Sequence, residues 1–371
     1  MAKDFAETEG LSLEDMEALA ETSDVYKPSD VDKWKWLRGG VAWPEKAPPD
    51  PPWILRMPSE GPGPGPGVLP TGKVSVLASP GGTGKSFVLA ALALAITTGR
   101  PFLKGQGLSQ GWLDICGKKG RVAVIFGEDD DDDVARRFYY QAKALGLSEE
   151  DRHIASEKLL AFGGQGTRFQ LINGEKASYS YTDLMNNLTA FLKEDVQRTG
   201  EPFRAILLDP LARFSPPEGE TDNHAATRLV EALETMAHSE ELGRPLVMAS
   251  HHTRKSSGDG ADPADKIRGA SGLRDGVRWA AMLERKSALK ELLPHGISGL
   301  VEAECVKSNV GAWPEKILLG RVDGGGLRGL SEQEEDRAWE AMEAAKDAKR
   351  KKREQPAKEA KAPTKKGTHT P

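Results

Sequence analysis

The feature of this 371-residue sequence that most restricts its fold is a glycine-rich loop with the sequence SPGGTGKS, residues 79–86. An apolar run suited to a β-strand precedes the loop at 73–78, and an apolar run suited to a helix follows it at 87–96. In this context backbone N–H groups bind phosphate oxygens, the lysine neutralises the β and γ phosphates, and the last hydroxyl binds Mg²⁺. The loop therefore predicts a site for ATP and Mg²⁺.

The residues expected to contact the nucleotide lie on this loop or directly after it, and they are Pro80, Gly81, Gly82, Thr83, Gly84, Lys85, Ser86 and Phe87. Lys85 is also expected to act in catalysis, and Ser86 to bind the metal ion. Ser79 stands where the usual pattern begins with glycine. This change affects how the chain enters the turn and leaves the later phosphate-contacting positions intact.

Four apolar runs, each followed by polar or glycine-rich residues, indicate a sheet, and they are 73–78, 121–126, 205–208 and 245–249. Their apolar residues are nearly continuous, as is typical of strands that are covered on both faces. Two later runs, 299–306 and 316–322, are expected to extend the sheet, as an antiparallel pair. The sequence thus predicts an α/β fold with a mostly parallel sheet flanked by helices and a C-terminal antiparallel extension.

The rest of the chain divides by composition. Residues 1–48 form an N-terminal extension that is expected to be partly disordered, with a weak helical pattern near 11–19. Residues 49–70 are dominated by Pro and Gly, which predicts a linker or a surface insertion, with the ordered core beginning near Trp53 or Val68. The ATPase domain is expected at 71–331. Residues 332–371 are expected to form a charged helix, through 348, and then a disordered basic tail.

The charge of the chain is uneven. The formal net charge is −5, yet residues 346–366 hold ten Lys or Arg and three acids. Such a segment can bind phosphates, or it can be a solvated tail, and both interpretations stay open.

Composition also bears on location and redox state. The most apolar stretch, 87–96, is about half the roughly 20 residues that a bilayer requires. The acidic first 20 residues lack the pattern of a secretory signal, so we expect a cytoplasmic protein with no membrane partner. Cys116 and Cys305 are far apart and have no partner at metal-ligand spacing, which predicts reduced thiols.

An acidic residue after the second predicted strand is suited to activate water. Glu128 follows the run 121–126, at the edge where ligands of open α/β sheets bind, and is the expected catalytic base. The alternative is that the acidic run 129–133 and Glu128 together serve a helix N-terminus. Asp130 to Asp133 are expected to cap that helix or to be solvated.

Two further strand ends carry polar residues. Asp209 ends the run 205–208, as in a Walker B motif, and is expected to hold Mg²⁺ together with Ser86. His251 and His252 follow the run 245–249, where a side chain can sense the γ phosphate. We expect a sensing role for at least one of the two.

Arginines and lysines in the polar loops are candidates for contact with DNA phosphates. An arginine there can also act as an arginine finger, which contacts the γ phosphate of the ATP bound to a neighbouring subunit. The loop 213–223 can line a central pore, and the loop 253–266 leads into Arg268 and Arg278. Arg278 is the preferred finger and Arg268 the alternative, while an ordinary surface ion pair remains open for both. The candidate DNA contacts are Arg213, Arg254 and Lys255.

These residues resemble a known family, the hexameric plasmid replicative helicase RepA with its phage and plasmid relatives among the RecA/DnaB-like ATPases. The stretches that carry the resemblance are 77–86, Glu128-Asp129, Leu208-Asp209, His251-His252 with Lys255, 268–271, 277–279 and 307–311. The resemblance spans about residues 50–331. The chain departs from it in the Pro/Gly insertion before the first strand and in the long loop between His252 and Arg268.

The resemblance implies a RecA-like P-loop core, a six-subunit ring and ATP sites between subunits. It also implies Glu128 as base, His252 as sensor and Arg278 as the finger in trans, with Lys307 as a further sensor or finger candidate. The expected function is a ring helicase that moves along single-stranded DNA, with replication-initiation proteins as possible partners. The alternative is a DNA-dependent ATPase that loads or remodels replication or recombination proteins without unwinding; a small-molecule kinase is less favoured, because no separate acceptor lid is evident.

Overall fold

The computed structural model describes residues 52–59, 61–103, 114–115, 119–175, 178–217, 222–253, 271–314 and 316–359. The predicted N-terminal extension, Cys116, the loop 254–270 and residues 360–371 lie outside the described residues. No helix in the described ranges is both long and apolar enough to cross a bilayer.

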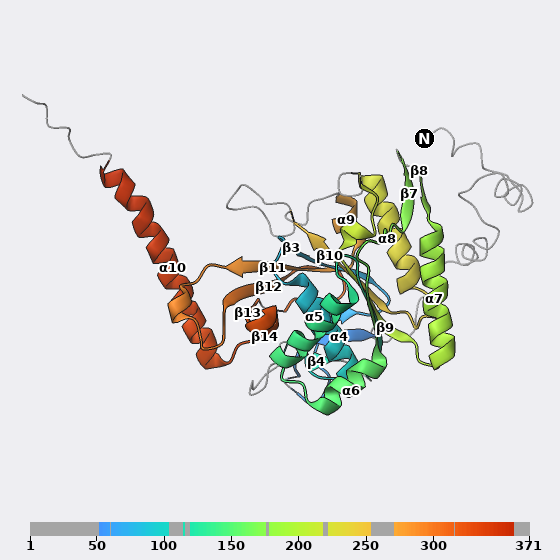
Figure 1. The fold of residues 1–371 in the computed structure, drawn as a ribbon, viewed down its shortest axis with the longest axis horizontal. Coiled ribbons are helices and arrows are strands. Elements are labelled where there is room, and N and C mark those ends of the chain that lie inside the picture. The colour runs from blue at the N-terminus through green and yellow to red at the C-terminus, as the bar shows by residue number, and fades with distance from the viewer. Residues whose placement is uncertain are drawn as a thin grey trace, which may run out of the picture. The chain divides into compact units, whose positions relative to one another are not determined.

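A nine-stranded sheet forms the centre of the fold (Figure 1), with the strand order β14-β13-β12-β11-β3-β10-β9-β5-β6. The strands are β3 (Val74–Ser79), β5 (Arg121–Phe126), β6 (Leu159–Gly163), β9 (Phe203–Asp209), β10 (Leu246–His252), β11 (Trp279–Lys286), β12 (Gly299–Ser308), β13 (Ile317–Arg321) and β14 (Leu327–Gly329). In this spatial order, the neighbouring strands β11, β3, β10, β9, β5 and β6 pair in parallel. The neighbouring strands β11, β12, β13 and β14 pair antiparallel. The predicted α/β fold, with a mostly parallel sheet and an antiparallel extension, is therefore confirmed.

The central parallel strands are mostly apolar because helices cover both faces of the sheet. On β9, Ala205 and Leu207 belong to the core on one face, and Ile206 and Leu208 to the core on the other. The first face carries α4 (Lys85–Thr98), α5 (Asp131–Ala144) and α6 (Glu149–Lys158), and the second carries α7 (Asp183–Thr199), α8 (Asn223–Ala237) and α9 (Ser271–Gly276). The two-residue alternation of each strand thus fills two separate apolar cores.

A second, three-stranded antiparallel sheet corrects the prediction of a linker at 49–70. It consists of β1 (Trp53–Arg56), β2 (Gly67–Pro70) and β4 (Asp114–Ile115), in the order β2-β1-β4. Ile54, Leu55 and the apolar residues of β2 pack into the same core as α4. The Gly-Pro run connects β1 to β2, and its prolines, which lack a backbone N–H, lie outside both strands. A short hairpin of β7 (Ile172–Glu175) and β8 (Ser178–Tyr181) completes the strands.

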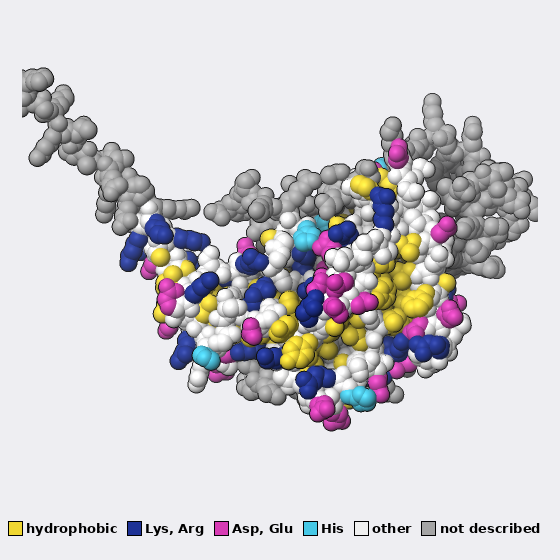
Figure 2. Space-filling model, viewed as in Figure 1, with side chains coloured by type: hydrophobic (Ala, Val, Ile, Leu, Met, Phe, Trp, Pro, Cys, Tyr) yellow, Lys and Arg dark blue, Asp and Glu magenta, His cyan; other side chains and the backbone are white. Residues whose placement is uncertain are grey.

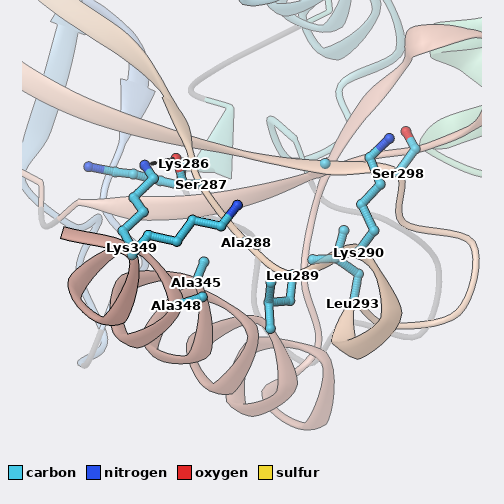
Figure 3. Close-up of a pocket in the computed structure, with 12 residues that line it drawn as sticks. Lys286, Ser287, Ala288, Leu289, Lys290, Leu293, Ser298, Ala345, Ala348 and Lys349 are labelled. Carbon is cyan, nitrogen blue, oxygen red and sulfur yellow. Dashed lines mark hydrogen bonds between the residues drawn. The ribbon is translucent and has the colours of Figure 1, made fainter. Parts of the chain in front are cut away.

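The C-terminal helix α10 (Glu332–Glu359) continues beyond residue 348, where the sequence predicted its end. Ala338 and Met342 pack with residues of β12 and β13 in a third apolar cluster. Beyond this contact, α10 and the turn after β11, including η5 (Lys290–Leu292), enclose a pocket with an apolar floor and a lysine rim (Figure 3). Lys and Arg side chains also gather along α10 at the surface (Figure 2).

Cys305 lies buried on β12, and burial raises the pKa of its thiol to about 11. A thiol with so high a pKa is almost entirely protonated at neutral pH and therefore unreactive.

Candidate nucleotide-binding site

The predicted phosphate loop connects β3 to α4 at the carboxyl edge of the parallel strands. Gly82 and Gly84 have φ angles of 67° and 117°, a region that favours glycine. Gly84 is the N-cap of α4, and Lys85 is its first residue. The free N–H groups of the first turn of α4 therefore belong to the loop, which is the arrangement that binds phosphate.

Lys85 is held inside this loop. Its side chain is buried, and its amine lies 3.3 Å from the carbonyl oxygen of Ser79, 3.2 Å from the Ser79 hydroxyl and 3.2 Å from Nδ1 of His252. Burial lowers the pKa of Lys85, while the charges of Asp209 and Glu128 oppose that shift. The hydroxyl of Ser79, which the usual glycine would lack, thus adds a second oxygen to the backbone carbonyl beside the lysine.

The side chains of the two candidate histidines lie on opposite faces of the sheet, because consecutive residues of a strand face opposite ways. His252 pairs in register with Ser79 and lines the pocket beside the phosphate loop. His251 is buried on the other face, and its Nε2 has no hydrogen-bond partner among the described residues. Burial, with the nearby His252 and Lys85, lowers the pKa of His251 to about 4.

Asp209 and Ser86, the predicted Mg²⁺ ligands, line the same pocket. Asp209 is buried at the end of β9, and the hydroxyl of Ser250 on β10 donates a hydrogen bond to its Oδ1. A fixed carboxylate and a hydroxyl at a helix N-terminus are the oxygen donors that Mg²⁺ prefers. The residues present therefore fit the metal that the phosphate loop implies.

Glu128 also lines this pocket. The backbone N–H of Gly127 donates to the carbonyl of Asp209 at 2.7 Å, which fixes the turn that carries Glu128 next to the end of β9. Arg213, a predicted DNA contact, lies with its Nε 3.2 Å from Oε1 of Glu128. Both side chains are about half exposed, so the ion pair is weak and can be broken by competing partners.

Four pocket residues were not among the predicted site residues: Asp129, Pro210, Arg137 and Arg321. Arg137 on α5 donates to Asp129, and its guanidinium lies 5.2 Å from the ring centres of both Phe87 and Phe126. Burial raises the pKa of Asp129, and Arg137 opposes the shift.

Asp129 was expected to belong to an acidic run that begins a helix, and the resemblance included it in the pair Glu128-Asp129 without giving it a role in the site. The prediction for that run is confirmed at Asp130, which caps α5 by accepting from the N–H of Asp133 at 2.7 Å. No local signal identified Arg321, which comes from the antiparallel extension.

Arg278 and Lys307 lie away from the pocket of their own chain. The N–H of Arg278 donates to the carbonyl of Val74, at the amino end of β3, whereas the phosphate loop follows its carboxyl end. The amine of Lys307 donates to the carbonyls of Arg274 and Asp275 near the same edge. Arg254, Lys255 and Arg268 lie outside the described residues. A finger role for Arg278 therefore requires a neighbouring copy.

Comparison with known proteins gives a family match and many similar solved structures, of which two follow. The sequence model described as an AAA domain matches residues 56–258. The ATPase domain of G40P is 13% identical, over 70% of this chain and 85% of that chain, with a TM-score of 0.45. A DnaB-like replicative helicase, described together with its interactions with primase, is 12% identical, over 70% of this chain and 58% of that chain, with a TM-score of 0.47. The family match includes the phosphate loop, Glu128, Asp209 and His252, and it ends before β11.

Proposed function

Because this chain belongs to the AAA domain family, we propose that it is an ATP-driven motor that moves along single-stranded DNA as a ring helicase. The observation that carries the proposal is one pocket, at the carboxyl edge of the sheet, lined by Lys85, Glu128, Asp209 and His252. A cation, a candidate base, a metal ligand and a candidate sensor thus surround the phosphate loop. These are the groups that phosphoryl transfer to water needs.

Each group has a distinct role in the proposal. ATP and Mg²⁺, when bound, supply the phosphoryl group and neutralise its developing charge, and Ser86 and Asp209 are the residues that hold the metal. Lys85 binds the β and γ phosphates, Glu128 orients and deprotonates the attacking water, and His252 senses the γ phosphate.

The contact between Glu128 and Arg213 supports coupling to DNA. Arg213 lies in the 3₁₀ turn η2 (Leu211–Arg213), at the start of the loop that we propose to line a central pore. A DNA phosphate that binds Arg213 competes with Glu128 for the same guanidinium. Release of Glu128 then makes the carboxylate more available to water when DNA is present.

The ring assembly rests on Arg278. Since Arg278 lies at the opposite edge of the sheet from its own phosphate loop, it serves as a finger only for a second copy. A ring of six copies, each with its ATP site at the interface, satisfies this geometry for every subunit. Replication-initiation proteins are the partners we propose for such a ring in the cytoplasm.

Strand displacement with the full chain and a Lys85→Ala variant tests the proposal, alongside DNA-stimulated ATP hydrolysis and the native mass. We expect unwinding and hydrolysis by the unchanged chain, their loss in Lys85→Ala, and a mass of six copies. Lys193→Ala is the matched control, because Lys193 is a surface residue of α7 paired with Glu241. Unwinding that persists in Lys85→Ala would refute the proposed site, and DNA-stimulated hydrolysis without unwinding would favour the loader.

A further inference from the structure

Two arginines of the antiparallel extension contact the phosphate loop of the same chain. Arg285 on β11 donates to the carbonyl of Gly82, and Arg321 at the end of β13 donates to the carbonyl of Thr83 at 2.5 Å. Arg321 also donates to the carbonyl of Gly325 at 3.3 Å and lines the nucleotide pocket. Neither strand lies within the segment that matches the AAA domain.

In the described part of the chain, the charges of these two arginines have no protein counter-ion. Among the described residues neither forms an ion pair, and both donate to backbone carbonyls. Arg328 on neighbouring β14 shows the contrast, because it forms a two-pronged ion pair with Glu334 at 2.7 and 2.8 Å. Burial, and the charge of Arg285, lower the pKa of Arg321. A half-buried cation beside a second cation is unfavourable unless an anion joins them.

The position of Arg321 is set by close packing of the segment that follows it. A Cβ on Gly325 would lie 2.9 Å from the ring of Phe87, and one on Gly324 would lie 2.0 Å from the ring of Tyr140. The buried side chain of Gln141 on α5 bonds to both the N–H and the carbonyl of Leu327. The end of β13 is therefore held against α4 and α5, and Arg321 is fixed beside the first turn of α4.

We propose that Arg321, assisted by Arg285, supplies part of the positive charge that binds the phosphates of the nucleotide, so that one chain's ATP site includes its own antiparallel extension. The inference rests on the proposed function, since it takes the nucleotide at the phosphate loop as given. Arg321 and Arg285 are positioning residues: they hold the loop through its carbonyls and add charge behind its N–H groups. The planar guanidinium fork suits phosphate oxygens as well as carbonyls.

Calorimetric binding of ATP, ADP and adenosine to the full chain tests this inference. The variants are Arg321→Gln, Arg321→Lys and Arg285→Gln, and Arg328→Gln is the matched control because its charge is already paired. We expect Arg321→Gln to weaken ATP binding by about 10-fold or more, ADP binding less, and adenosine binding by less than about 2-fold. Arg321→Lys should recover part of the loss, since it keeps the charge and loses the fork, and Arg285→Gln should have the smaller effect because Arg285 is exposed.

The outcomes separate this inference from the proposed function. If the unchanged chain binds ATP and Arg321→Gln binds it equally well, the inference is overturned and the proposed function stands. An equal loss for all three ligands would also overturn it, because a merely structural role does not depend on phosphate charge. Failure of the unchanged chain to bind ATP would overturn both the inference and the proposed function. Should Arg321→Gln not fold, the ATP-to-adenosine ratio of Arg321→Lys decides, with no change in that ratio counting against the inference.

Discussion

The amine of Lys85 lies 3.2 Å from Nδ1 of His252, although 167 positions separate the two residues in sequence. The contact arises because β10 lies beside β3 in parallel, with His252 in register with Ser79. A histidine nitrogen that accepts from an ammonium group carries no proton of its own. Lys85, the proposed phosphate-binding lysine, and His252, the last residue of the neighbouring strand, are thus joined directly.

His252→Ala should reduce the rate of ATP hydrolysis by about 10-fold or more, because a γ-phosphate sensor acts mainly after binding. ATP affinity should change by less than about 3-fold, since the phosphate loop and Lys85 stay in place. Steady-state kinetics and calorimetry measure the two quantities. His153→Ala, at an exposed position on α6, is the control. A large loss of affinity with an unchanged rate would contradict the sensing role.

Glu128→Gln should abolish most hydrolysis and keep ATP binding. The amide has nearly the same shape as the carboxylate but cannot take a proton from water, and general-base catalysis contributes about 10²- to 10⁴-fold. Single-turnover hydrolysis and ATP binding check this expectation. Glu150→Gln, on the exposed first turn of α6, should behave as the unchanged chain does. Hydrolysis at more than about a tenth of the original rate in Glu128→Gln would assign the base elsewhere.

Arg213→Ala should lower the stimulation of ATP hydrolysis by single-stranded DNA by up to about 5-fold. The reason is that the variant removes the group for which Glu128 and a DNA phosphate compete. The fold should persist, because a half-exposed ion pair contributes about 1 kcal/mol or less. The ratio of rates with and without DNA is the measurement, with Arg136→Ala as the control, since Arg136 is also a surface arginine paired with an acid, Asp133. An unchanged ratio would show that DNA does not act through Arg213.

His251 should make the protein less stable in mild acid. Its pKa is about 4 in the folded chain and 6.5 ordinarily, so the unfolded chain binds the extra proton between those values. The stability that neutral His251 contributes is complete above pH 6.5 and is lost as the pH falls toward 4. At about 1.4 kcal/mol per pKa unit the loss approaches roughly 3 kcal/mol.

Urea unfolding at pH 7, 5.5 and 4 measures this loss in the unchanged chain and in His251→Asn. The variant should show a flatter dependence on pH over the same range. Equal slopes for the two proteins would mean that other groups cause the acid sensitivity.

The amino-acid sequence was enough to identify the features that depend on neighbouring residues. Local pattern predicted the phosphate loop with its strand and helix, and the apolar runs of β3, β5, β9 and β10. It also predicted the polar residues at the ends of three of these strands: Glu128 after β5, Asp209 on β9 and the two histidines on β10. Parallel strands bring their carboxyl ends to one edge, so Lys85, Glu128, Asp209 and His252 were expected together. The short strands β1 and β2 were missed because the Pro and Gly content of 49–70 outweighed two four-residue apolar runs.

Only the tertiary structure decided which side chains reach the loop from far along the chain. Pairing of β11 to β13 with the parallel sheet brings Arg285 and Arg321 to Gly82 and Thr83, and the sequence carries no motif for a contact across more than 200 positions. Strand alternation likewise places His252 in the pocket and His251 in the core, which two adjacent histidines do not reveal. Local pattern determines which backbone a segment adopts, whereas the sheet order and the packing of both faces determine which charges meet.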